Sequence, residues 1–565
     1  MTPQAASALL RHYALLLDLL GEDSFRARTY DNAARMLEAQ AEPLDALIAQ
    51  NRLQQIKGIG PGIASALIEI SSRGTFSDLD AAQQKVPPGV LDLLRIEGLG
   101  VKKARVLWKE GRVTSLDELE SALHQDIVSR LPGFGAKTAE KFRISLEFLK
   151  TVSGRHLRHH ADRAAEAVRQ SLAAIPGIQE VFFGGSLRRC LETVGDLDVL
   201  VIALPDALSS VRRSIEQHSG FTWTDTGPIL RGATAARFPV ELSLIPPQQA
   251  ALRKVIVTGS KDHVRALLAI AARRGVDPEQ LPAQSEQDVY SALGLEYVPP
   301  ALRESADTVV AAGSCTFPTP VALSDIRGIL HCHTPASDGH STLRELVTAM
   351  IDKGYEYLGI ADHSQAAAYA HGLTPDRVRA QWKEIDELNR EVAPFRVLKG
   401  TEVDIHADGR LDFDDDLLAG FDFVIASIHT GFAMTEDEAT NRLCRALENP
   451  HVDILGHATG RLLLERIGYP VNHERLIECA ARHGKAIELN SNPHRLDLDW
   501  RWLAQCEAAR VPVPLNPDAH IVDGLWEIRY GVEVAAKGPL TAANCPSTWP
   551  VDTFLNWCNI HTRET

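Results

Sequence analysis

The chain has 565 residues, of which 45% are hydrophobic, and its 8 cysteines are scattered singly. This length is too great for one hydrophobic core and predicts several domains, and the composition is typical of a folded globular protein. No apolar run approaches the ~20 residues that a bilayer span needs, the N-terminus lacks the layout of a signal peptide, and no C-x-x-C pair indicates a disulfide framework or a thiolate zinc site. We therefore expect a cytoplasmic protein with no membrane partner.

The net charge of −15 is distributed unevenly along the chain. Residues 1–150 hold 19 basic and 19 acidic side chains and residues 151–304 hold 17 of each, so the remaining 23 basic and 38 acidic side chains account for the whole net charge. The first half is neutral and can still present local basic patches, so the global charge does not exclude nucleic acid. The acidic surplus falls in the last part of the chain, where metal-binding carboxylates are expected.

A nine-residue pattern occurs three times in residues 1–150, which otherwise read as short amphipathic helices. The copies begin at Ile56, Ile96 and Leu131, and in each of them two glycines flank one apolar residue just before a predicted helix. Such a turn points backbone N–H groups outward at the positive end of a helix and forms a phosphate cradle that ignores sequence. One copy alone is explained equally well as a helix–turn–helix connection, but three matching copies favour binding to the DNA backbone. The predicted DNA-binding residues are Gly58, Gly60, Gly62, Gly98, Gly100, Lys102, Lys103, Gly133, Gly135 and Lys137.

From about Ile175 the pattern changes to strands, and it contains a second constellation. A Gly-Gly-Ser-Leu-Arg-Arg turn at residues 184–189 follows a strand, and the next strand carries Asp196 and Asp198. Alternate residues of a strand point to the same face, so the two carboxylates converge and can hold two divalent metals for phosphoryl transfer. The Gly-Ser turn and Arg189 can hold a triphosphate. A D-x-D pair alone is common on surface strands, but its place shortly after this turn favours nucleotidyl transfer.

Residues 1–304 resemble a family X DNA polymerase, the class of DNA polymerase beta. The resemblance rests on residues 21–30, the three hairpins, the G-S-x-R-R-x(6)-D-x-D spacing, Thr258-Gly259-Ser260 and Leu302-Arg303-Glu304. It implies Mg²⁺ or Mn²⁺ as cofactor, and dNTPs and gapped or nicked DNA as substrates. The implied catalytic residues are Asp196, Asp198 and Glu241, and the implied nucleotide-binding residues are Gly185, Ser186, Arg189, Gly259, Ser260 and Lys261.

Four positions depart from the family's pattern. The third metal-binding carboxylate is Glu241 instead of an aspartate, and the aromatic pair expected before Thr258 is Ile256-Val257. The lysine that forms a Schiff base in lyase-active relatives falls at Ala66. The departures predict weak or manganese-favouring polymerase activity, and no deoxyribose-phosphate lyase activity by that route.

Beyond about residue 323, seven apolar strand candidates each end in residue types that bind metals. In a (β/α) barrel all these ends meet at one mouth, where active sites are built. Imidazoles and carboxylates suit zinc, manganese or iron rather than calcium, and their number predicts two or three ions. A single histidine at a strand end is more often a capping or core residue, but seven successive ends favour a centre that cleaves phosphate esters. The candidate ligands at these ends are His331, His333, His363, Glu402, His429, His457, Asp518 and His520.

Residues 323–565 resemble a PHP (polymerase and histidinol phosphatase) domain, whose fold is a distorted seven-stranded barrel that holds three metals. The stretch from His331 to Gly339 matches its first motif, and either Asp338 or His340 takes one ligand role. The implied ions are Zn²⁺, Mn²⁺ or both, and Arg461 after His457 is expected to bind phosphate. The order of modules is that of bacterial family X polymerases.

The expected architecture is an α-helical helix-hairpin-helix region at 1–80 (8-kDa-like) and 81–154 (fingers-type), an α+β nucleotidyltransferase palm at 155–250, a thumb-type nucleotide-binding subdomain at 251–304, a linker at 305–322 and an α/β PHP domain at 323–565. We expect a monomeric DNA repair polymerase that fills short gaps and a PHP phosphoesterase that acts as a 3′-5′ exonuclease. The alternatives are a PHP phosphatase of small molecules with a decayed polymerase, and a nuclease whose polymerase half only binds DNA.

Overall fold

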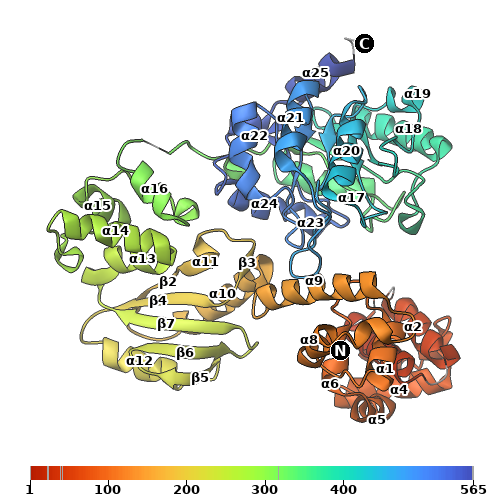
Figure 1. Cartoon of the computed structure of the whole chain (residues 1–565), viewed down its shortest axis with the longest axis horizontal. Helices are drawn as coiled ribbons and strands as arrows, with labels where there is room; N and C mark the ends of the chain where they lie inside the picture. Colours follow the sequence, from red (N-terminus) through yellow and green to blue (C-terminus); the bar gives the residue numbers. More distant parts are fainter. Residues whose placement is uncertain (1, 22–23, 39, 41, 316, 563–565) are drawn as a thin grey trace. The chain divides into compact units, whose positions relative to one another are not determined.

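The computed structural model describes residues 2–21, 24–38, 40, 42–315 and 317–562. The chain divides into two compact units, Met1–Ser153 and Gly154–Thr565 (Figure 1). Among the helices of the described residues, none combines the length and the apolar character that a membrane span requires. The predicted fold class is confirmed: helical hairpins come first, an α+β palm follows, and a curled parallel α/β domain comes last.

The first unit consists of helices around one hydrophobic core that runs from Ala6 to Leu149. The segments expected at 1–80 and 81–154 share this core, because apolar faces from both halves of the unit pack together. Its helices are α1 (Pro3–Leu20), α2 (Ser24–Glu38), α3 (Leu44–Ala49), α4 (Pro61–Arg73), α5 (Ser77–Lys85), α6 (Pro88–Leu93), α7 (Val101–Lys109), α8 (Leu116–His124) and α9 (Ala136–Val152).

The second unit begins with a five-stranded sheet in the order β2-β4-β7-β6-β5. Its strands are β2 (Ile178–Phe183), β4 (Leu197–Ala203), β5 (Phe221–Thr226), β6 (Ile229–Thr234) and β7 (Pro239–Ile245), and only β4 and β7 run parallel to each other. One face is covered by α10 (Arg158–Ala173) and α12 (Leu208–Glu216), which bury alternate residues of β4 such as Val199 and Val201. Leu200 and Ile202 face the other side, against α13 (Ala250–Thr258). The side chains at positions 196 and 198 follow the register of this second face.

Four helices, α13, α14 (Lys261–Arg273), α15 (Glu286–Ala292) and α16 (Ala306–Ala311), build a small core of their own. The stretch 305–322, expected as a linker, is therefore folded in its first part. Val309 and Ala312 lie one helical turn apart and are buried in this core, which explains why the segment forms a helix in spite of its Ala-, Thr- and Pro-rich composition.

The last domain has a parallel sheet in the order β13-β12-β11-β10-β9-β8, with β14 paired to β15 beside it. The strands are β8 (Gly328–Ile329), β9 (Tyr357–Ile360), β10 (Arg396–Asp404), β11 (Phe423–Ser427), β12 (Ile454–Leu455), β13 (Ala486–Ile487), β14 (Leu489–Asn490) and β15 (Leu515–Asn516). A parallel bridge between Cys332 and Ala519 connects the segments that follow β8 and β15, so the sheet curls. The seven expected strand positions are present, the sixth of them broken into β13 and β14.

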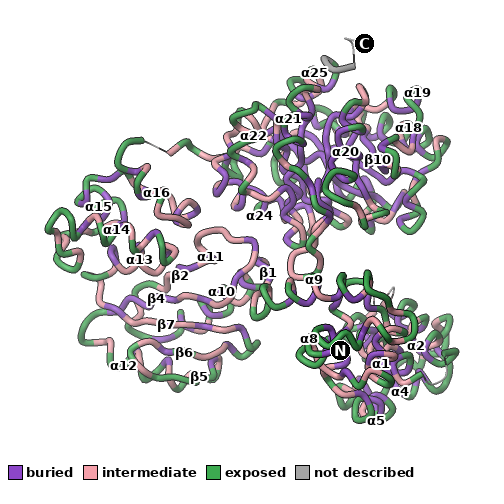
Figure 2. Tube along the Cα trace, viewed as in Figure 1, coloured by how far each residue is buried: buried purple, intermediate pink, exposed green. Residues whose placement is uncertain are grey.

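Helices cover the outside of this curled sheet. Figure 2 shows buried chain, in purple, concentrated around β10 and the inner sides of the neighbouring helices. The longer helices are α17 (Leu343–Asp352), α18 (Pro375–Val392), α20 (Glu436–Leu447), α21 (His473–His483), α24 (Ile528–Ala535) and α25 (Val551–Thr562). The strands are buried on both faces, as expected for a parallel sheet, and their carboxyl ends open toward a common site.

Charged side chains connect the last domain to the palm and its helices within the second unit. The Lys537 side chain, 0% exposed, donates from Nζ to Glu304 Oε1 at 2.6 Å and to the carbonyl of Arg189 at 2.9 Å. Arg158, at the start of α10, pairs with Glu533 of α24 at 2.6 Å. Buried charges remain charged only with good partners, so these contacts fix how the two parts of this unit fit together.

Candidate active sites

The three glycine hairpins have the same local geometry. Gly58, Gly98 and Gly133 have φ of 90°, 76° and 80°, values that side chains rarely adopt, and a helix begins three residues after each of them. The helices α4, α7 and α9 have no side-chain cap and no acidic residue in the first turn. Their N-terminal N–H groups are therefore free for an anion, and no carboxylate opposes it.

The surroundings of the hairpins leave room for a DNA backbone. A Cβ added at Gly60, Gly62, Gly100 or Gly135 would meet no atom within 4 Å. Lys102 and Lys137 are exposed beside the turns, and the Nζ of Lys103 lies 3.4 Å from the carbonyl of Gly98. The structure thus places each predicted DNA-binding glycine and lysine at the surface of the first unit, around three separate cradles.

In the palm, the strand pairing brings the predicted carboxylates together. Asp198 of β4 lies directly opposite Glu241 of β7, and Asp196 precedes β4 by one residue. Arg231 of β6 donates from Nε to Glu241 Oε1 at 2.7 Å, which orients the longer side chain at this position. Burial and the neighbouring charges of Asp196 and Glu241 raise the pKa of Asp198 to about 7. Three mutually repelling carboxylates at one edge form a site that favours divalent cations.

The glycine turn lies against these carboxylates. Gly185 has φ of 57°, and a Cβ there would come within 1.7 Å of Asp198 Oδ2. The N–H of Gly184 donates to the carbonyl of Asp198 at 2.8 Å. Glycine is therefore required at Gly185 both for its backbone conformation and for the space, and Ser186 on the same turn, α11 (Gly185–Arg188), lies next to the metal-binding edge.

Two buried clamps, which the sequence did not reveal, hold the arginines of this turn. Arg189 pairs with Glu304 at 3.1 Å and donates to the carbonyl of Thr258 at 2.8 Å. Arg188 pairs with Glu286 at 2.5 Å and donates to Thr258 Oγ1 at 2.7 Å. The turn at 184–189, the 258–260 segment and the 302–304 segment thus meet, with Ser260 N bonded to the carbonyl of Arg303 at 2.9 Å. Lys261, the first residue of α14, is exposed beside them.

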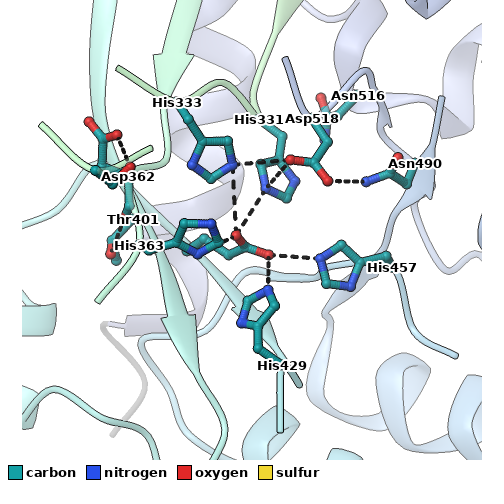
Figure 3. Close-up of polar contacts among 12 residues, drawn as sticks. His331, His333, Asp362, His363, Thr401, His429, His457, Asn490, Asn516 and Asp518 are labelled. Atoms are coloured by element: carbon teal, nitrogen blue, oxygen red, sulfur yellow. Dashed lines mark hydrogen bonds and ion pairs between the residues drawn. The ribbon is translucent and has the colours of Figure 1, made fainter. Parts of the chain in front are cut away.

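In the last domain, the strand ends bring the predicted ligands to one buried cluster (Figure 3). Its side chains form three groups in which the candidate ligand atoms lie within 4.8 Å of one another: His333, Asp338, His363 and His520; His331, His333 and Asp518; and His363, Glu402 and His429. His457 Nε2 lies 2.9 Å from Glu402 Oε1. All nine predicted ligands thus lie in a single cluster, which includes Asp338, whereas His340 is exposed.

Glu402 lies at the centre of this cluster. One carboxylate oxygen is 2.9 Å from His363 Nδ1 and the other is 3.2 Å from His429 Nε2. Burial alone would raise its pKa, but the surrounding histidines, His429, His363 and His331, hold the pKa of Glu402 well below its usual range. Asp518 also has a pKa well below its usual range, since burial is outweighed by His331 and His333. The two ionised carboxylates require positive charge around them.

The donor set fits metal ions. Among the described residues, His331 Nε2 and His333 Nδ1 are buried without a hydrogen-bond partner. Buried polar atoms without partners are costly, and coordination to cations would satisfy them. Three groups of imidazole and carboxylate donors are compatible with the two to three zinc or manganese ions that the sequence predicted.

Several polar residues that orient the ligands were missed from the sequence. His331 Nδ1 lies 2.8 Å from Glu488 Oε2, and His429 Nδ1 lies 3.1 Å from Asp404 Oδ1. Asn490 donates to Asp518 at 3.2 Å. Such partners fix the ring orientation and raise the basicity of a ligating imidazole. Asn490 ends β14, Asp404 ends β10 and Glu488 lies between β13 and β14, but none of the three was among the predicted ligands.

The guanidinium of Arg461, the residue expected to bind phosphate, is engaged by acceptors of the segment 495–499. It donates to the carbonyl of Arg495 at 3.0 Å, to Asp499 at 2.6 Å and to the carbonyl of Leu496. The guanidinium therefore supports the backbone at 495–499. The cation beside the metal ligands is Arg495, whose Nε lies 3.6 Å from Asp518 Oδ2. The sequence favoured Arg461 because it follows His457 closely, but its contacts are made across the fold.

Two carboxylate-rich metal sites on one chain, joined to three anion-binding hairpins, define a DNA-binding nucleotidyltransferase with a metallophosphoesterase domain. The comparisons with known proteins agree. A helix-hairpin-helix domain matches residues 1–76, a SAM-like helix-hairpin-helix tandem matches residues 90–147, and a PHP domain matches residues 330–492. The chain is 36% identical, over 97% of its length and 98% of the relative's, to the DNA polymerase/3′-5′ exonuclease PolX of Bacillus subtilis (strain 168). The chain belongs to the PolX family.

Other relatives match a smaller part of the chain. A probable phosphatase of Caldanaerobacter subterraneus subsp. tengcongensis is 32% identical over 29% of this chain and 61% of its own length. A probable phosphatase of Acetivibrio thermocellus is 34% identical over 29% of this chain and 64% of its own length.

Proposed function

We propose that the chain is a DNA repair polymerase whose PHP domain acts on DNA ends as a 3′-5′ exonuclease. The observation that carries the nuclease part is the convergence of nine candidate ligands, Glu402 and Asp518 among them, in one cluster. Ions held by these residues would supply Lewis-acid chemistry at a phosphate ester. Arg495, beside Asp518, would bind the phosphate.

The nuclease activity is tested with His331→Ala and, as a conservative variant, Glu402→Gln. We expect each to degrade a 3′-labelled single strand about 100-fold more slowly than the unaltered chain, and to contain less zinc and manganese by elemental analysis. Unchanged degradation by pure His331→Ala protein would refute the assignment, because a contaminating nuclease would then explain the activity.

We propose that the palm extends a 3′ hydroxyl into short gaps. Asp196, Asp198 and Glu241 would hold Mg²⁺ or Mn²⁺, and Gly185, Ser186, Arg189, Gly259, Ser260 and Lys261 would surround the dNTP. The direct pairing of Asp198 with Glu241 supports this assignment. The test is incorporation on a one-nucleotide gap, first with magnesium and then with manganese. We expect Asp198→Ala to abolish it; incorporation by that variant at the wild-type rate would exclude the site.

The hairpins would bind the DNA on which both activities act, and we propose that this DNA is gapped or nicked. We also propose that the chain works as a monomer in the cytoplasm. Sedimentation of the pure protein with and without gapped DNA tests the monomer, since a second copy would double the sedimenting mass.

A second candidate, hydrolysis of small phosphomonoesters, rests on the similarity of the last domain to probable phosphatases. Turnover of single-stranded DNA and of a simple phosphomonoester at the same enzyme concentration separates the two candidates. Faster turnover of the phosphomonoester would favour the phosphatase and leave the hairpins with a role in localisation only.

A further inference from the structure

One aromatic side chain is exposed at the edge of the buried metal cluster. Tyr369 is 64% exposed. Its ring centroid lies 6.3 Å from that of His363 and 6.4 Å from that of His429, two of the ligands. Large exposed aromatic side chains next to a catalytic centre leave apolar area available for a substrate, since nothing in the folded chain covers them.

The segment that carries Tyr369 is held in place at both ends. Leu373 N donates to the carbonyl of His363 at 2.7 Å, and a Cβ at Gly372 would come within 1.8 Å of the carbonyl of Ser364. Arg377 donates to the carbonyl of His371 at 2.8 Å and also to the carbonyl of Ala336, in the first ligand motif. The short helix η7 (Ala368–Ala370) therefore displays the ring from a closed loop that is anchored to the metal site.

The hydroxyl of Tyr369 does not explain why this side chain lies beside the cluster. Among the described residues, the Tyr369 hydroxyl forms no hydrogen bond, and its neighbours include the carboxylates of Glu402 and Asp404. The π face of the exposed ring is therefore the feature that a ligand can use.

We propose that Tyr369 forms a nucleobase subsite, on which the base of the 3′-terminal nucleotide stacks while its phosphodiester lies on the metal cluster. The inference rests on the proposed exonuclease function and names its substrate class: a single-stranded 3′ end with an intact base. Stacking on an aromatic face tolerates every base, so the subsite is indifferent to sequence. The ring centroid of Tyr369 lies 6.3 and 6.4 Å from those of two ligand imidazoles. A base stacked on the ring therefore lies close enough to the cluster for its own phosphate to reach it.

The proposal is tested on the full chain with two single strands that differ only at the last nucleotide. One ends in a normal nucleotide and the other in an abasic tetrahydrofuran residue. For the unaltered protein we expect a KM about tenfold lower on the strand with the base, in keeping with one stacking contact. Tyr369→Ala should raise the KM on that strand to the value of the abasic strand, with kcat unchanged on both.

Tyr369→Phe is the matched control, because it keeps the ring and removes only the hydroxyl; we expect it to retain the tenfold preference. A Tyr369→Ala protein that keeps the preference, or an unaltered protein that has none, would overturn the subsite. His331→Ala separates this result from the proposed function itself. If that variant cleaves both strands at the wild-type rate, the exonuclease assignment fails, whereas loss of cleavage together with an unchanged base preference in Tyr369→Ala refutes only the subsite.

Discussion

At the scale of single residues, the neutral His263 links acid pH to the stability of the helices behind the nucleotide site. The side chain is fully buried, and its Nε2 lies 2.8 Å from the hydroxyl of Tyr290. Burial, and then the charge of Arg303, lowers its pKa to about 4. The unfolded chain binds a proton below about pH 6.5, while the folded chain does not until about pH 4. The stabilisation is therefore complete above pH 6.5 and is lost as the pH falls toward 4.

We expect the free energy of unfolding of the second unit to fall when the pH is lowered from 7.5 to 5.5, both in the unaltered chain and in His263→Gln. The fall should be about 1 kcal/mol smaller in His263→Gln. Glutamine keeps a polar group for Tyr290 and cannot be protonated in this range. The measurement is urea unfolding at both pH values, with His124→Gln, 71% exposed in its side chain, as control. Identical pH dependence in His263→Gln and the unaltered chain would contradict the prediction.

We expect alanine substitution of two arginines, Arg461 and Arg495, to affect different properties: stability for the first and catalysis for the second. Arg461→Ala leaves buried acceptors at 495–499 without donors, and we expect it to cost about 1–3 kcal/mol of stability. Arg495→Ala should leave the melting temperature unchanged and lower kcat/KM for a phosphodiester about tenfold, because its guanidinium is directed to the metal ligands. Thermal melts and steady-state kinetics of both variants test the pair of roles. A drop in melting temperature in Arg495→Ala but not in Arg461→Ala would contradict this assignment of the two roles.

At the scale of elements, the sequence predicted those features that are determined by the spacing of residues close together in the chain. The hairpins were predictable because two glycines at a fixed distance from a helix start determine the turn, and the strand ends because seven apolar runs stop at the same residue types. The arginine clamps were not predictable. Arg189 and Glu304 are separated by more than a hundred residues, and nothing local marks them as partners. The contacts of Arg461 were not predictable for the same reason: its three acceptors lie more than thirty residues away along the chain.

The second hairpin gives a prediction about DNA affinity. Lys102 lies in the first turn of α7, exposed, beside the Gly98 turn. If it contacts a phosphate, Lys102→Ala should weaken binding equally for all sequences and reduce the slope of log K against log salt concentration by about 1. Lys109→Ala is the matched control, since Lys109 lies at the other end of the same helix, over the ring of Trp108. Equal slopes for Lys102→Ala and the unaltered chain would place the DNA elsewhere.

At the scale of the molecule, the second unit joins polymerase and phosphoesterase chemistry through buried charges. Lys537 connects three acceptors from the polymerase part: Glu304 and the carbonyls of Arg189 and Ala301. Glu304 in turn pairs with the Arg189 side chain. One ammonium group of the PHP domain therefore supports both the backbone and, through Glu304, the guanidinium of the residue proposed to contact the triphosphate.

Lys537→Met keeps the length of the side chain and removes its charge, so two carbonyls lose this donor and Glu304 keeps only the Arg189 side chain as its ion-pair partner. We expect a loss of about 1–3 kcal/mol in the free energy of unfolding of the second unit, because the removed donor was buried. Lys383→Met, exposed on α18, should change it by less than about 0.5 kcal/mol. Since Arg189 loses support while the metal ligands do not, KM for the dNTP should rise more than KM for exonuclease cleavage. Equal effects on both would mean that Lys537 fixes only the fit between the two parts and does not position the nucleotide turn.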